Sequence, residues 1–217
     1  LLALLIGTAL GMVSGVLVTK GRLQPFIATL VTMTVYRGLT MIYMDGKPIS
    51  GLGDSFVLKF VGKGKLFGIP VPVILFIIIF AVFMFLLEKT VFGRRVYSTG
   101  SNWKAAKLAG VNIDRTKLAV YAISGGMAAL SGLILLSRLG SAQPNLGDGY
   151  ELDAIAAVAL GGTSMNGGRG RIWGTFVGVL IIAVLNNGLN ILGVSSYYQE
   201  VVKGIVILIA VLSDRKR

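Results

Sequence analysis

The polar side chains that could do chemistry occupy a few short segments of this 217-residue chain, between long apolar runs. The sequence contains no histidine and no cysteine, so the commonest general base, the commonest metal ligand and the thiol nucleophile are all missing. It also lacks a Gly-rich loop ending in Lys-Ser or Lys-Thr, the pattern that holds nucleotide phosphates. These features predict a protein with no catalytic residues, no metal site, no cofactor and no ATPase site of its own.

Three amides form the first group that could bind a ligand. Asn186, Asn187 and Asn190 lie near the end of an apolar run, where Asn186 and Asn190 would share one helix face. Their side chains would hydrogen-bond either to the hydroxyls of a sugar in a transport pathway or to a neighbouring helix. Both interpretations stay open from the sequence.

A Gly-rich segment, 161–170, is the second group. Glycine tolerates backbone conformations that other residues avoid, so a helix would break here and the chain would turn sharply. Gly161, Gly162 and Thr163 are therefore candidate residues of a helix break or of a transport pathway.

A short helix is expected within a long polar segment. Ser101 or Asn102 is suited to cap its amino end, and Gly110 is suited to end it after about two turns. Ala105 and Ala106 would give this helix a small, flat face that could dock into a groove on another protein. The alternative is a basic surface helix that lies on anionic lipid.

Charged residues near or within the apolar runs have two interpretations each. Glu151 and Asp153 would contact an outside protein, or form the solvated start of a helix that the helix dipole favours. Arg37 and Lys203 lie inside apolar runs, where a charge is costly. We expect both to reach the membrane surface or to pair, with Glu200 as a possible partner of Lys203.

The apolar runs themselves indicate an all-α fold. The mean hydropathy is +0.81 and 54% of the residues are hydrophobic, more than is usual in a soluble domain. Uncharged runs of about 18 residues can cross a bilayer as helices. The sequence predicts a polytopic transmembrane bundle of about seven segments, of which one is short or broken: 1–18, 27–43, 71–87, 118–136, 154–160, 172–189 and 200–212.

The basic residues predict the orientation. A net charge of +12 would suggest nucleic-acid binding in a soluble protein, but here the lysines and arginines gather between the apolar runs. Cytoplasmic segments retain Lys and Arg, so the polar segment 88–117 and the carboxyl terminus are expected inside the cell. Membrane lipid, and no nucleic acid, is the expected environment.

Small residues recur at every fourth position in three of the runs. Such ridges let helix backbones approach closely, which is how helices associate in lipid. The ridges are Ala3, Gly7, Gly11 and Gly15; Ser124, Ala128 and Gly132; and Gly174 with Gly178.

Two sets of motifs carry a family resemblance. Ala105-Ala106-x-x-x-Gly110 is similar to the core of the cytoplasmic coupling-loop motif of ABC importer permeases, although Lys104 stands where many of those proteins have an acid. From about Gly21 onward the chain closely resembles the bacterial ribose permeases and their sugar-importing relatives. The most specific stretches are Gly149 to Val158, Leu160-Gly161-Gly162-Thr163-Ser164 and Leu185-Asn186-Asn187-Gly188-Leu189-Asn190.

The resemblance implies a single transmembrane permease domain over 1–217, with a cytoplasmic coupling loop at 88–117. Permeases of this kind have more membrane helices than the chain supplies, so it is expected to be a fragment whose missing helices precede Leu1. The implied partners are a second permease, an ATP-binding cassette ATPase and an extracytoplasmic sugar-binding protein. The implied function is import of ribose or a related monosaccharide across the bacterial plasma membrane by alternating access, with ATP bound by the partner.

Other functions remain open. A permease of the same family could carry another sugar, an autoinducer or a branched-chain amino acid. An ion-coupled secondary transporter is less favoured, because no apolar run holds an acid away from its ends. An intramembrane enzyme is disfavoured by the missing histidine and cysteine.

Overall fold

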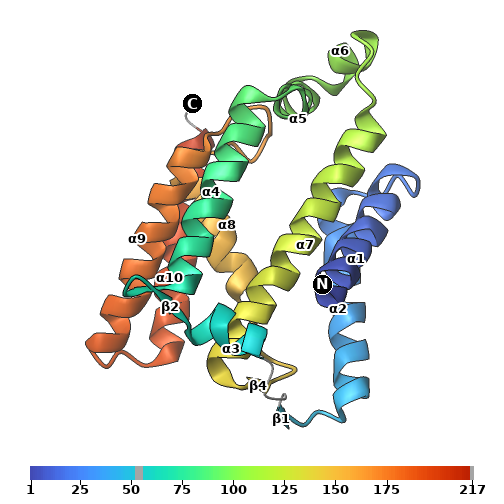
Figure 1. Cartoon of the computed structure of the whole chain (residues 1–217). Coiled ribbons are helices and arrows are strands. Elements are labelled where there is room, and N and C mark those ends of the chain that lie inside the picture. The colour runs from blue at the N-terminus through green and yellow to red at the C-terminus, as the bar shows by residue number, and fades with distance from the viewer. Residues whose placement is uncertain (52–55, 216–217) are drawn as a thin grey trace. The chain divides into compact units, whose positions relative to one another are not determined.

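The computed structural model describes residues 1–51 and 56–215, which fold into two compact units. The first unit comprises residues 1–78 and 112–146, and the second comprises residues 79–111 and 147–217, of which the structure describes 147–215. Figure 1 shows that long helices make up most of both units, as the sequence predicts. The last residues of the basic carboxyl terminus, Lys216 and Arg217, lie outside the described part of the chain.

The first unit is built on two helices in close contact, α1 (Leu2–Thr19) and α7 (Ile113–Leu139), with α2 (Pro25–Met44) and α3 (Phe56–Lys63) beside them. Two short antiparallel ladders complete it. β1 (Ile49–Ser50) pairs with β4 (Ser141–Ala142), and β2 (Lys65–Leu66) pairs with β3 (Ile69–Pro70).

The second unit contains α5 (Val91–Ser101), α6 (Trp103–Leu108), α8 (Tyr150–Leu160), α9 (Ile172–Ile191) and α10 (Ser196–Arg215). The helix α4 (Val71–Lys89) begins in the first unit and ends in the second. The apolar core of the second unit lies where α8, α9 and α10 meet, at Ala156, Ala157 and Ile182, with Val206 and Ile207 packed against them.

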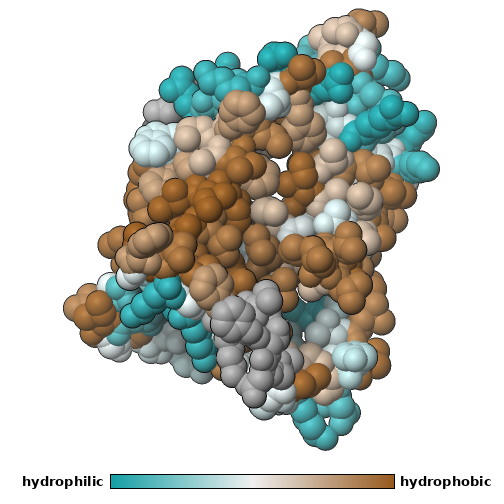
Figure 2. All heavy atoms as spheres, viewed as in Figure 1, coloured by the Kyte–Doolittle hydropathy of each residue, from teal (hydrophilic) through white to brown (hydrophobic). Residues whose placement is uncertain are grey.

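The prediction of a polytopic helical membrane protein is confirmed. Among the described residues, α1, α2, α4, α7 and α9 are long and apolar enough to cross a membrane. The other two predicted segments correspond to α8, which has 11 residues and is the expected short helix, and to α10, which has 20. Figure 2 shows hydrophobic side chains over the middle of the long helices and hydrophilic side chains near helix ends.

Several helix boundaries differ from the predicted ones because caps extend the helices beyond their apolar runs. Asn112 caps α7, its Oδ1 accepting from Arg115 N at 3.0 Å, so α7 begins at Ile113 rather than at Leu118. The helix α5, which starts after the cap Thr90, is not among the predicted helices. Hydropathy gave no signal for α5, since its residues are largely polar.

Glycine brings α1 and α7 into backbone contact. A Cβ on Gly11 would collide with Tyr121 O, and one on Gly125 would lie 2.8 Å from Gly11 Cα. The predicted ridge on α1 is therefore in the interface. The predicted ridge on α7 is displaced by one residue, because Gly125 and Ala129 face α1, whereas Gly132 has open space beside it.

This interface gives a test on one helix. Gly125→Ala should destabilise the full-length protein by about 1–3 kcal/mol, because the added methyl meets rigid backbone. Gly132→Ala, on the same helix but with nothing within 4 Å, should be neutral or slightly stabilising. The apparent free energy of unfolding in a denaturing-detergent titration measures both. Equal effects of the two substitutions would contradict the interface.

Candidate functional site

The helix predicted between Asn102 and Gly110 is present as α6. Asn102 is the residue that caps it, with its Oδ1 accepting from Ala105 N at 3.1 Å. Ser101, the alternative cap, is instead the last residue of α5. Gly110 follows the end of the helix with a φ of +82°, in the left-handed region that favours glycine.

The exposed face of α6 is partly apolar. Leu108 is 91% exposed and Trp103 is 54% exposed, whereas Ala106 is buried and Ala105 is exposed. Leu108 and Trp103 are thus large apolar side chains exposed at the two ends of this six-residue helix. The sequence predicts an exposed face formed by Ala105 and Ala106, whereas the large exposed apolar side chains of α6 are Leu108 and Trp103.

The Gly-rich segment 161–170 docks on α5. Tyr97 of α5 donates its hydroxyl hydrogen bond to Gly170 O at 3.0 Å. At Gly168, which has a φ of +74°, a Cβ would lie 2.5 Å from Ser101 Cα, so only glycine allows the loop backbone to approach α5 this closely. The loop is thus seated directly beside the start of α6.

The same segment ends α8 and connects it to α9, as the predicted helix break requires. Gly161 caps α8, with its N–H bonded to Ala157 O at 2.9 Å, and Gly162 takes a φ of +80°. Thr163 lies next in the turn, with its N–H bonded to Val158 O at 3.2 Å. Gly161 also lies against the backbone of Gly174 on α9, so the loop is held at both of its ends.

A polar cluster joins α8, α9 and α10 near the other end of these helices. Asp153 Oδ2 accepts from Lys203 Nζ at 2.9 Å and from Asn186 Nδ2 at 3.3 Å. The side chains of Lys203 and Asp153 are only 25% and 19% exposed. Two further acceptors, Asp153 Oδ1 and Asn186 Oδ1, are buried without a partner among the described residues.

The position of this cluster follows from helical spacing. Asp153, Asn186 and Lys203 each lie three or four residues before or after a core residue of their own helix, so they share the core face one turn away. The structure pairs Lys203 with Asp153, and the expected partner Glu200 is exposed instead. This pair could not be predicted from helical spacing, because its members are 50 residues apart in the sequence.

The remaining candidate residues are more exposed. Asn190 Oδ1 accepts from Gln199 Nε2 at 3.0 Å, which ties the end of α9 to the start of α10. Asn186 and Asn190 thus both bond to other helices, as one of the two interpretations expects, while Asn187 is exposed. Glu151 is exposed at the start of α8, and Arg37 is exposed on α2.

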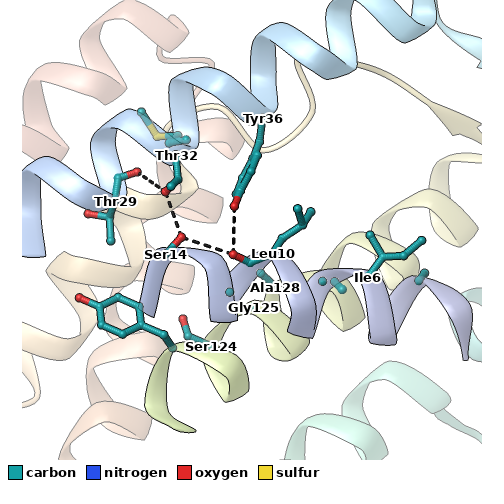
Figure 3. A pocket seen from close by; sticks show the side chains of 15 residues that line it. Ile6, Leu10, Ser14, Thr29, Thr32, Tyr36, Ser124, Gly125 and Ala128 are labelled. Carbon is teal, nitrogen blue, oxygen red and sulfur yellow. Dashed lines mark hydrogen bonds between the residues drawn. The ribbon is translucent and has the colours of Figure 1, made fainter. Parts of the chain in front are cut away.

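A pocket of about 680 Å³ in the first unit was not foreseen from the sequence (Figure 3). It lies between α1, α2 and α7, and several hydroxyls point into it. Ser14 Oγ donates to Thr32 Oγ1 at 3.0 Å, and Tyr36 donates to Leu10 O at 3.0 Å. These bonds join α1 to α2, and the exposed lining of the pocket is mainly apolar.

The fold and these features define a polytopic helical membrane protein with a short exposed helix, α6, in its second unit. The family described as branched-chain amino acid transport system/permease component matches residues 1–211. The chain belongs to this family. No solved structure matches the chain.

The chain is also similar to individual permeases. It is 60% identical over 204 residues to the ribose import permease protein of Bacillus subtilis strain 168, covering 94% of this chain and 63% of that protein. It is 52% identical over 217 residues to the ribose import permease protein of Escherichia coli K12, covering 99% and 68%. With the D-allose transport system permease protein of the same strain the identity is 43% over 211 residues, covering 97% and 64%. The chain thus spans about two thirds of the length of these curated relatives.

The docked loop predicts different effects for two glycines of positive φ. Gly168→Ala should loosen the loop, because the methyl strains the backbone and also meets Ser101. Gly162→Ala brings similar backbone strain, but has nothing within 4 Å. Tryptic cleavage after Arg169 should therefore be about tenfold faster in Gly168→Ala than in Gly162→Ala, because local opening exposes the site. Equal cleavage rates would mean that the loop does not depend on this contact.

The polar cluster predicts coupling between Asp153 and Lys203. Asp153→Asn or Lys203→Met alone should each cost about 1–3 kcal/mol of stability, because each leaves a half-buried charge unpaired. The double variant should lose clearly less than the sum. A denaturing-detergent titration of the full-length protein measures the stability of the two single variants and of the double variant. Glu200→Gln, at an exposed position, is the matched control and is expected to leave the stability unchanged. Additive losses would refute the pair.

Proposed function

We propose that this chain is the membrane-spanning permease part of an ATP-binding cassette importer that moves ribose, or a closely related monosaccharide, into the cytoplasm. It has no ATPase site of its own and needs no cofactor. A separate ATPase subunit binds and hydrolyses ATP, docks on α6, and switches the pathway between outward and inward access. An extracytoplasmic sugar-binding protein delivers the substrate.

The proposed substrate is supported by the differences in sequence identity among the relatives. Identity is 52–60% with ribose import permease proteins along nearly the whole chain, but 43% with the D-allose permease protein and 41% with the L-arabinose permease protein of Escherichia coli K12. The same comparison makes another monosaccharide the second candidate. An ion-coupled mechanism is less favoured, since the half-buried Asp153 is neutralised by Lys203.

The docking of the ATPase on α6 is supported by the exposure of Leu108 and Trp103 beside a rigid seat on α5 and the Gly-rich loop. The alternative for α6 is a basic helix lying on anionic lipid, which is less favoured because six residues offer little apolar face to bury in the lipid interface. The positions of the basic segments support a cytoplasmic location for α6 and the carboxyl terminus. Pairing of two permeases as a homodimer completes the proposed assembly.

Uptake into vesicles tests this function. The full-length protein, with its ATPase and its binding protein, should take up labelled ribose only when ATP is inside, in preference to allose, arabinose and branched-chain amino acids. Leu108→Glu should reduce uptake at least tenfold without impairing insertion, because it places a charge at an apolar anchor. Lys107→Ala, an exposed change on the same helix, should stay within about twofold.

The outcomes separate the parts of the proposal. Preferred uptake of another solute would keep the mechanism and change the substrate. Uptake that continues without the ATPase would contradict the importer and favour an ion-coupled carrier.

A further inference from the structure

The start of α9 carries a polar pocket that the proposed function does not use. The pocket, of about 620 Å³, lies between the Gly-rich loop, Tyr97 of α5 and the first turn of α9. Two arginines line it, Arg169 and Arg171, and none of the described residues around it is acidic. Both arginines are exposed, and neither forms an ion pair with a described residue. The pocket is therefore a site of uncompensated positive charge.

An apolar groove continues from this pocket along α9. It is open to the outside and has a volume of about 490 Å³; the residues that line it repeat at the spacing of one helix face and are Val177, Leu180, Ile181, Val184 and Leu185. Trp173 belongs to the pocket and lies one turn before Val177, so pocket and groove follow one another on the same face. The groove extends about 12 Å along the helix axis, most of the roughly 15 Å depth of one leaflet of the hydrocarbon core.

Trp173 marks where the polar pocket gives way to the apolar groove. It is 58% exposed and stacks on Phe176 with ring centroids 5.3 Å apart, and Phe80 of α4 lies 6.3 Å from it. Tryptophan is enriched at the membrane–water interface, where one end of the side chain is wet and the other apolar. Arginines on the wet side of such a residue stand at the depth of lipid phosphates.

We infer that the pocket and the groove form one binding site for an anionic phospholipid. The phosphate lies between Arg169 and Arg171, and an acyl chain follows the groove from Val177 toward Leu185. A basic pocket beside a membrane helix selects anionic headgroups, and a guanidinium matches the geometry of phosphate oxygens. Charge complementarity at one end and apolar continuity at the other together favour a lipid over a soluble phosphate. This inference goes beyond the proposed transport and does not depend on the substrate.

Quenching of Trp173 by brominated lipid tests the site. The chain has two tryptophans, so Trp103→Phe leaves Trp173 as its single reporter. The full-length protein with Trp173 as its sole tryptophan is placed in bilayers that contain brominated phosphatidylglycerol or brominated phosphatidylcholine. We expect half-quenching at about a tenfold lower mole fraction of phosphatidylglycerol, a preference that salt weakens.

Matched variants test the contributions of the arginines and of the groove to the preference for phosphatidylglycerol. Arg169→Gln with Arg171→Gln should abolish it, while Arg94→Gln with Arg95→Gln, an exposed pair on α5 outside the pocket, should retain it. Leu180→Phe should fill the groove and reduce quenching, and Leu208→Phe on α10 should not.

Three results would overturn the inference. Equal quenching by both lipids, or a preference that survives loss of Arg169 and Arg171, would mean ordinary contact with the bilayer. Absence of quenching by either lipid would mean that protein, such as a second copy of this chain, covers this face. Because the readout is fluorescence, none of these results bears on whether the protein transports ribose.

Discussion

Contact between helix backbones at glycine is the interaction on which both units depend. Helices in lipid gain nothing from hydrophobic burial against one another, so they associate where small residues allow dense packing. In the first unit Gly11 and Gly125 bring α1 against α7. In the second unit Gly178 lies against Ala157 O and Gly174 against Gly161, which sets α9 against the short helix α8. A side chain at any of these positions would force two helices apart.

The features of the second unit follow from that packing. Because α8 and α9 are in backbone contact, Asp153 and Asn186 come within hydrogen-bond distance near one end, and Lys203 of α10 completes the charge balance. At the other end the loop between α8 and α9 is rich in glycine, so it can lie against α5 at Gly168. The short helix α8 thus connects a polar cluster to the docked loop beside α6. In the proposed importer, this places the surface for the ATPase on a rigid support.

Much of the fold and of the candidate site could be predicted from the sequence, because the interactions that determine these features are local. Uncharged runs gave the membrane helices, Asn102 and Gly110 gave the limits of α6, and the glycines of 161–170 gave the break after α8. These features depend on hydropathy, on capping and on the freedom of glycine, all of which act within a few residues.

The parts that could not be predicted depend on tertiary structure. The predicted partner of Lys203, Glu200, was wrong. Glu200 is near Lys203 in the sequence, but Asp153 is near it in space. The α7 ridge was displaced by one residue because several small residues, Ser124 to Ala129, could each have faced α1. The hydroxyl-lined pocket (Figure 3) requires the relative positions of three helices, and α5 lacks the apolar run by which the other long helices were found.

The central claim is that α6, seated on α5 and the Gly-rich loop, is the surface on which an ATPase subunit docks. Cross-linking from a single cysteine tests it directly in a full-length protein without other cysteines. Leu108→Cys should cross-link to the ATPase subunit in membrane vesicles, while Leu192→Cys, which is also largely exposed and lies between α9 and α10, should not. Cross-linking from residue 192, or from neither residue while ribose uptake is retained, would contradict the account.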